Sequence, residues 1–265
     1  MPRTSQGKFV TEASKVFQKA DDFWRAGSYE EARQNYGKAA GLYHERDDVE
    51  GEAFALFRLG ELELSLDNFE AADKALKAAA ALVEHTDYAQ NTYGEILIKT
   101  AQLDVARGNL AQARTYLKKA KSVLAAIDNR DLLGEVFEQE AYIALLEERE
   151  TDALSAYRKA ADLFRNDGTG LKEASTLRAI ARIEMKHKNY DEAHDVLERC
   201  RNLYRENGDL LGEASALSAI GCLRYIIRDI ANARKALMKS VYLYGKVSHH
   251  YAQAESLLYL AGRRF

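Results

Sequence analysis

The sequence predicts an all-α protein built from repeated antiparallel helix pairs, and three observations support this prediction. Its 265 residues contain one proline, Pro2, although strand-and-turn folds use proline freely and helix interiors exclude it. Small residues recur about every 40 positions along nearly the whole chain. Around each of them, apolar residues follow the three-to-four-residue spacing of one helix face.

One series of alanines marks the second helix of each pair. Its members are Ala32, Ala72, Ala113, Ala153, Ala193 and Ala233. A bulky apolar residue follows each alanine after four positions, a small residue after seven and an aliphatic residue after ten. In the first repeat these residues are Tyr36, Ala39 and Leu42. Such spacings place all four residues on one face of an α-helix.

A second series of small residues lies twelve positions upstream and marks the first helix of each pair. Its members are Ala20, Gly60, Ala101, Ala141, Ala181, Gly221 and Ala261. Another small residue precedes each marker by seven positions, and an apolar residue precedes it by four. Small side chains let two helices approach closely. We therefore expect Gly60, Ala101, Ala141 and Ala181 to be buried at helix contacts.

Short polar segments connect the predicted helices. Turns such as Gly27-Ser28 and Gly108-Asn109 join the two helices of a pair, and Asp48 and Asp209 are suited to cap the helices that follow them. The predicted repeats span approximately 9–48, 49–88, 89–129, 130–169, 170–209 and 210–249, with a terminal helix over 250–265 and a flexible N-terminus over 1–8. No linker interrupts the pattern, so we expect a single domain over 9–265.

The repeat resembles the tetratricopeptide-repeat (TPR) family. That family carries Leu-Gly in the first helix, and an alanine, an aromatic residue and a further alanine in the second. Leu59-Gly60 matches the first element, and Ala32, Tyr36 and Ala39 match the second. The long period and the missing proline after the second helix are similar to the 40-residue-period subclass, found in cell-division scaffolds, bacterial regulators and peptide sensors. The resemblance implies a right-handed superhelical α-solenoid of about six units plus a C-terminal helix, with protein or peptide binding as its function.

The resemblance also places a concave partner-binding groove along the first helices. The residues expected on that face are Phe17, Phe57, Ile98, Tyr142, Arg178, Arg182 and Lys186. Their aromatic and aliphatic members would take the apolar side chains of a bound segment. The three cations, four residues apart on one helix, would hold an acidic stretch or a terminal carboxylate. Alternatively, groove acids such as Glu138 pair with these cations, which then serve only solubility.

No sequence motif indicates a catalytic, metal or cofactor site. The chain has no glycine-rich phosphate loop, no His-Glu-x-x-His and no Cys-x-x-Cys pair. Cys200 replaces an alanine of the repeat, so burial is expected, and Cys222 is expected at the edge of the groove. The net charge of −3 does not favour nucleic-acid binding. The absence of a long apolar run, of a secretory signal and of a disulfide framework predicts a cytoplasmic protein without a membrane span.

Two functions remain open on the sequence alone. The first is a scaffold or adaptor that binds a peptide or helix of a partner protein in the concave groove. The second is a sensor or regulatory module that controls a separate effector chain. The terminal helix adds a further expectation, because Ala254, Leu257, Leu258, Leu260 and Ala261 keep the apolar register. Leu258, Tyr259 and Phe265 of this helix either close the sixth repeat or mediate self-association.

Overall fold

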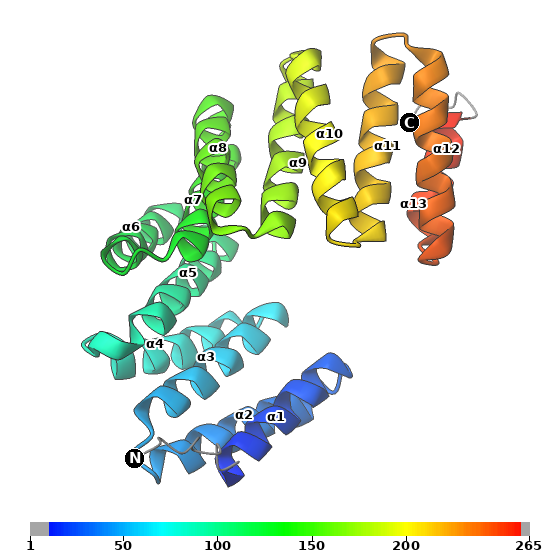
Figure 1. Ribbon diagram of the computed structural model, residues 1–265. Coiled ribbons are helices and arrows are strands. Elements are labelled where there is room, and N and C mark those ends of the chain that lie inside the picture. Colours follow the sequence, from blue (N-terminus) through cyan, green and yellow to red (C-terminus); the bar gives the residue numbers. More distant parts are fainter. Residues whose placement is uncertain (1–10, 261–265) are drawn as a thin grey trace, which may run out of the picture. The chain divides into compact units, whose positions relative to one another are not determined.

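The computed structural model describes residues 11–260, which are almost entirely helical (Figure 1). The α-helices are α1 (Glu12–Arg25), α2 (Tyr29–His44), α3 (Val49–Ser65), α4 (Phe69–Val83), α5 (Gln90–Ala106), α6 (Leu110–Ala126), α7 (Arg130–Leu146), α8 (Glu150–Asp167), α9 (Gly170–Lys186), α10 (Tyr190–Glu206), α11 (Leu210–Ile226), α12 (Ile230–Lys246) and α13 (His250–Leu260). A short 3₁₀ helix, η1 (Asp87–Ala89), precedes α5. No strand occurs within residues 11–260, so the predicted all-α fold is confirmed.

Within each unit, neighbouring helices such as α1 and α2 or α11 and α12 pack side by side as antiparallel hairpins, and Figure 1 shows this arrangement clearly for α9 to α12. Every turn between the two helices of a pair includes a residue with left-handed backbone geometry, for example Gly27, Asp67 and Lys188. Three residues separate the two helices of each pair, and this tight reversal brings their apolar faces together. None of the helices within the described range is long and apolar enough to span a bilayer.

The chain divides between Leu132 and Leu133 into two compact units. Unit 1 contains α1 to α6 and the start of α7, with Tyr36, Leu76 and Leu117 among its fully buried side chains. Unit 2 contains the rest of α7 and α8 to α13, with Phe164 and Leu197 in its core. The single domain over 9–265 stays a prediction, and its flexible N-terminus over 1–8 lies outside the described residues.

The small residues of the first helices lie where the second helix of the same repeat passes closest. A Cβ atom added to Gly60 would lie 2.7 Å from Cγ of Leu76, and one added to Gly221 would lie 2.6 Å from Cγ of Leu237. The predicted burial of Gly60, Ala101, Ala141 and Ala181 is confirmed. A larger residue at these markers would therefore push the two helices of a repeat apart.

Both predicted N-caps are confirmed. The Asp48 carboxylate accepts a hydrogen bond from the backbone N–H of Gly51 at 2.9 Å, and Asp209 accepts one from Gly212 at 2.8 Å. Each of these glycines also lies against a tyrosine of the preceding helix. A Cβ atom on Gly212 would lie 2.3 Å from the Tyr204 ring. Capping and close approach together determine where α3 and α11 begin.

The register of the terminal helix differs from the sequence expectation. Ser256 is the buried residue of α13, and its hydroxyl lies 3.2 Å from that of Ser218 and 3.3 Å from that of Ser240. Ala254 and Leu257, expected to continue the apolar register, are exposed. In the upstream repeats, the equivalent positions of the first helix face the second helix of the same repeat. No such second helix follows α13 within the described residues. Ala261 and Phe265 lie outside those residues.

Candidate partner-binding groove

The three predicted cations line one groove of unit 2. Arg178, Arg182 and Lys186 lie on one face of α9, beside a groove of about 700 Å³ between α9 and α11. The lining of the groove is Ser175, Arg178, Ala179, Ala181, Arg182, Met185, Lys186, Leu197, Ala219 and Ile226. Leu197 comes from α10 and is buried, whereas Ile226 at the end of α11 is 46% exposed. The groove therefore combines a cationic edge with an apolar floor.

Small side chains keep this groove open. Ala179 and Ala219 each lie two positions before the marker of their helix. In unit 1 the same positions carry Arg58 and Lys99, whose long side chains cross to the preceding first helix. Arg58 Nη2 lies 3.2 Å from Oδ1 of Asp21, and Lys99 Nζ lies 3.0 Å from Oε1 of Glu61. Alanine at this position leaves the corresponding space in unit 2 unfilled.

The same comparison explains the electrostatics of the groove. Arg182 occupies the position of Asp21 and Glu61, one residue after the marker, but Ala219 offers it no charged partner. Arg178 donates a hydrogen bond to Oγ of Ser215 at 3.2 Å. Neither arginine forms an ion pair with any residue between 11 and 260. Two guanidinium groups thus face the groove without a carboxylate.

Lys186 behaves differently, because a neighbouring acid neutralises it. Its ammonium group pairs with Glu150 at the start of α8, and Nε2 of His187 lies 2.8 Å from the other oxygen of that carboxylate. Hydrogen bonds from Lys186 and His187 hold the pKa of Glu150 below its usual range. Glu138 is engaged by the hydroxyl of Thr176. Of the three cations, Lys186 therefore pairs with an acid of the chain, whereas Arg178 and Arg182 do not.

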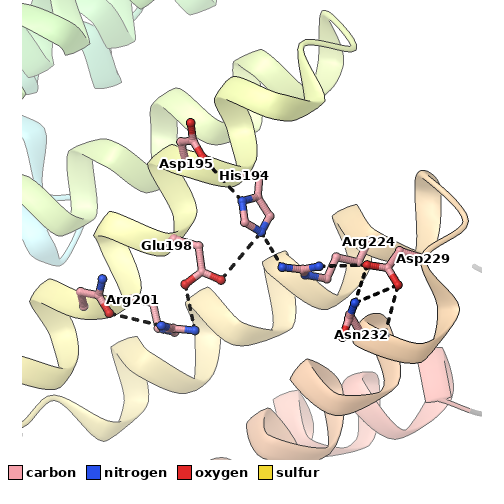
Figure 2. A network of polar contacts seen from close by, with 8 residues as sticks. His194, Asp195, Glu198, Arg201, Arg224, Asp229 and Asn232 are labelled. Atoms are coloured by element: carbon pink, nitrogen blue, oxygen red, sulfur yellow. Dashed lines mark hydrogen bonds and ion pairs between the residues drawn. The ribbon is translucent and has the colours of Figure 1, made fainter.

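A polar network joins α10 to α11 (Figure 2). Arg224 Nη2 donates to Nε2 of His194 at 2.7 Å, an arrangement that requires an unprotonated Nε2. Nη1 of Arg224 lies 2.9 Å from Oδ2 of Asp229, which also accepts hydrogen bonds from Asn232. The network therefore holds the end of α11 against α10.

Two residues expected on the groove surface belong to the core, which corrects the sequence expectation. Phe57 is 4% exposed and Ile98 is 1% exposed, so neither offers a usable surface to a partner. Phe17 is half-buried, with its ring centroid 5.6 Å from that of Tyr36. Large apolar side chains three positions before the marker pack between neighbouring helices, because burial removes their surface from water.

Sequence reasoning also missed an exposed aromatic residue of unit 1. Phe54 is 39% exposed, its ring centroid is 5.4 Å from that of Phe17, and it lines an open groove of about 1130 Å³ together with Gln18 and Lys19. It lies six positions before Gly60, on the same helical stripe as the predicted residues, so helical spacing would have found it. Tyr142 is 47% exposed on α7 and is not among the residues that line the groove of unit 2.

Neither cysteine has the properties of a nucleophile. Cys200 is fully buried and its Sγ lies 3.2 Å from the carbonyl oxygen of Ala174, which confirms the predicted packing role. Burial raises the pKa of Cys200 to about 12. Cys222 is half-buried, and burial also raises its pKa. No group of three metal-ligating side chains occurs in the part of the chain that the structure describes.

Similarity to known proteins is detectable only through structure. No protein-family model matches the sequence, and no curated protein matches it significantly. A solved structure from Pyrococcus horikoshii, a signal transduction ATPase with numerous domains (STAND) with a tetratricopeptide repeat sensor, superimposes with a TM-score of 0.71. The alignment covers 95% of this chain and 38% of that chain at 17% identity. The chain has a tetratricopeptide-repeat fold.

Two other solved structures match this chain over most of their length. BtubC (BKLC) from P. vanneervenii has a TM-score of 0.68 and 16% identity, with coverage of 90% of this chain and 93% of that chain. A Rap protein complexed with competence and sporulation factor has a TM-score of 0.68 and 12% identity, with coverage of 95% and 74%. At such identities the likeness establishes the fold alone.

Proposed function

We propose that this chain is a non-catalytic scaffold or adaptor that binds an acidic segment of a partner protein in the groove between α9 and α11. The observation that carries the proposal is a pair of arginines, Arg178 and Arg182, that lie beside an apolar floor and have no carboxylate partner within residues 11–260. In unit 1 the corresponding groove charges are neutralised within the chain. In unit 2 a carboxylate from another molecule would complete the same pairing.

The chemistry of the groove defines the segment. Arginine presents a planar fork that binds a carboxylate through two hydrogen bonds, so acidic side chains or a terminal carboxylate suit Arg178 and Arg182. Met185 and Ile226 would contact an aliphatic side chain next to the acid. The groove is open to water, which does not suit the preorganised, water-excluded environment of a catalytic site. Binding without turnover is therefore the function that fits this geometry.

A second candidate function is a peptide sensor whose output lies on a separate effector chain. It is favoured by the similarity to a STAND protein with a tetratricopeptide repeat sensor and to a Rap protein complexed with competence and sporulation factor. A sensor must change its conformational equilibrium when its ligand binds. Peptide binding would then alter hydrogen-exchange protection in helices far from α9 and α11, whereas a plain adaptor would show protection at the groove alone.

The proposal is tested by selecting a peptide-display library on the parent protein and on the double variant Arg178→Ala/Arg182→Ala. We expect the parent to enrich peptides that combine acidic and aliphatic residues, and the double variant to lose that preference. Binding of a selected peptide should weaken as salt rises, because the groove is exposed to solvent. Replacement of its glutamates by glutamine should have the same effect as the double variant.

Two further variants make the test specific. Arg205→Ala/Arg234→Ala removes two exposed arginines of unit 2 that lie outside the groove lining, so it should retain the acidic preference. Ala219→Glu places a carboxylate next to Arg182, as Arg58 stands next to Asp21 in unit 1, and should block binding while both arginines remain. The proposal is wrong if the parent shows no acidic preference, or if the double variant keeps it.

A further inference from the structure

The groove between α9 and α11 retains two positive charges with which no carboxylate between residues 11 and 260 pairs. Glu150 pairs with Lys186, so the two charges are those of Arg178 and Arg182. No aspartate or glutamate of the described range lines this groove. Because the two arginines are four residues apart on one helix, their side chains leave the same face of α9 about 6 Å apart. A ligand that neutralises both must therefore bring two negative charges close together.

Unit 1 shows how one planar group satisfies two charged residues at the equivalent place. The guanidinium of Arg58 lies 3.2 Å from Oδ1 of Asp21 through Nη2 and 2.9 Å from Oε2 of Glu61 through Nη1. In unit 2, Arg182 stands at the position of Asp21, so the sign of the charge is inverted. Ala219 stands at the position of Arg58, so the space for a bridging group is open. A group that bridges arginines in this space would be an anion of another molecule.

A neutral hydroxyl group orients Arg178 without cancelling its charge. Nη1 of Arg178 donates to Oγ of Ser215 on α11 at 3.2 Å. One turn further along both helices, Arg182 stands opposite the short side chain of Ala219. A guanidinium group has five N–H donors, and this bond uses one of them. Both arginines therefore have N–H donors left for an anion in the same part of the groove.

We propose that this site binds a phosphorylated serine or threonine of the partner segment, an inference that rests on the proposed function and specifies its ligand. A phosphoryl group carries a charge of about −1.5 to −2 at pH 7 and three strong acceptor oxygens, so it can bind Arg178 and Arg182 at once. One carboxylate has a single charge and two oxygens, which one arginine satisfies. Two acidic side chains would have to be ordered together, at a greater cost in conformational entropy.

The apolar part of the groove defines the neighbour of the phosphorylated residue. Met185 follows Arg182 by three residues, about 4.5 Å along the helix axis, and Ile226 lies on the opposite wall. An extended peptide advances about 3.3 Å per residue. An aliphatic residue one or two positions from the phosphorylated residue would therefore contact Met185 and Ile226. Nucleic acid offers no such side chain, and each of its phosphodiester groups carries one charge.

The test is a peptide library with randomised flanking positions and a central serine, glutamate or phosphoserine, selected on the 265-residue chain. We expect enrichment of phosphoserine peptides with an aliphatic residue one or two positions away. One enriched sequence is then synthesised in all three forms, and its Kd is measured by fluorescence anisotropy. The phosphoserine form should bind about 10-fold or more tightly than the glutamate form, because it engages two arginines instead of one.

Single substitutions show whether both arginines act on one group. Arg178→Ala and Arg182→Ala should each reduce the advantage of phosphoserine over glutamate to less than about 3-fold, because the remaining guanidinium serves either anion. Arg205→Ala/Arg234→Ala removes two exposed arginines outside the groove lining and should keep the full advantage. An advantage of phosphoserine that survives either single substitution overturns the inference.

The outcomes separate this inference from the proposed function. If the glutamate form binds as tightly as the phosphoserine form, the phosphoryl site is wrong and the acidic-segment adaptor stands. If neither form binds, or if Arg178→Ala/Arg182→Ala binds both as the parent does, both proposals are wrong. A single-stranded RNA of eight nucleotides should not displace the phosphopeptide at equal concentration. Displacement by this RNA would overturn the inference and assign the site to nucleic acid.

Discussion

Gly37 and Gly108 have opposite effects on stability, although a Cβ atom would meet nothing within 4 Å at either position. Gly37 lies inside α2, where glycine costs backbone entropy without any packing benefit. Gly108 ends α5 with φ of +78°, a conformation that glycine adopts without strain. Lys188 occupies the equivalent turn of the fifth repeat with φ of +63°, so a side chain is tolerated there at a cost.

This difference gives a matched pair of substitutions. Gly37→Ala should raise the free energy of unfolding by about 0.5–1 kcal/mol, because it improves helix propensity. Gly108→Ala should lower it by about 1 kcal/mol, because alanine must adopt left-handed geometry. Urea unfolding followed by circular dichroism measures both. Equal effects of the two substitutions would contradict the conformational argument.

The reactivity of the two cysteines should follow their burial. At pH 8 the Cys200 thiol remains protonated, because burial raises its pKa to about 12. Ellman's reagent should therefore leave Cys200 unmodified in the folded protein, and both thiols should react at once in denaturant. The variant Cys222→Ser isolates the Cys200 signal. Rapid modification of Cys200 in that folded variant would show that α9 and α10 open readily.

At the scale of elements, buried carboxylates connect helices of successive repeats. Arg33 on α2 donates to Glu63 on α3 at 3.0 Å, and Arg158 on α8 donates to Glu184 on α9 at 2.8 Å. Both acids are nearly fully buried, and an asparagine of the following turn also donates to each of them. Each buried carboxylate therefore connects the second helix of one repeat with the first helix of the next repeat and with the turn that follows that helix.

The hydrogen bonds of Glu63 predict a specific pH dependence of the free energy of unfolding. Hydrogen bonds from Arg33 keep the pKa of Glu63 below its usual range in the folded state. This stabilisation is complete above the unfolded pKa and is lost as pH falls through the folded pKa. Glu63→Gln should cost about 1–3 kcal/mol at pH 7, and the difference from the parent should shrink below about pH 4.

The control for this prediction is Glu50→Gln, which alters an exposed carboxylate of the same helix. It should change the free energy of unfolding by less than about 0.5 kcal/mol at any pH. Urea titrations at a series of pH values measure both variants. A pH-independent cost for Glu63→Gln would show that its charge does not contribute to stability.

At the scale of the whole molecule, a repeat protein distributes stability through contacts between neighbouring helices. Ala141 on α7 is fully buried in a cluster with Ala153 and Tyr157. Ala141→Leu should overpack this cluster and cost about 1–3 kcal/mol. Hydrogen exchange should show reduced protection in α8 to α10, with little change in α1 to α4. An unchanged unfolding midpoint would contradict the assigned register.

Much of this fold could be predicted because the information is local and repeated. Helix spacing, capping aspartates and small residues at fixed intervals act within one or two turns of the chain, so the helix pairs, the N-caps and the buried markers followed from residue types alone. The same periodicity placed Arg178, Arg182 and Lys186 on one face of one helix. Because the pattern recurs seven times, the prediction of the helices and of their buried faces does not depend on any single residue.

Only the tertiary structure decided which of those side chains are available. Phe57 and Ile98 are buried while Phe54 is exposed, because burial depends on the helix that lies alongside rather than on helical phase. Lys186 is paired because Glu150, 36 residues earlier, lies beside it, and Arg182 has no carboxylate partner within residues 11–260, where the short Ala219 stands opposite it. Ala254 and Leu257 keep the register yet stay exposed, because burial requires a second surface, and a helix cannot supply that surface for itself.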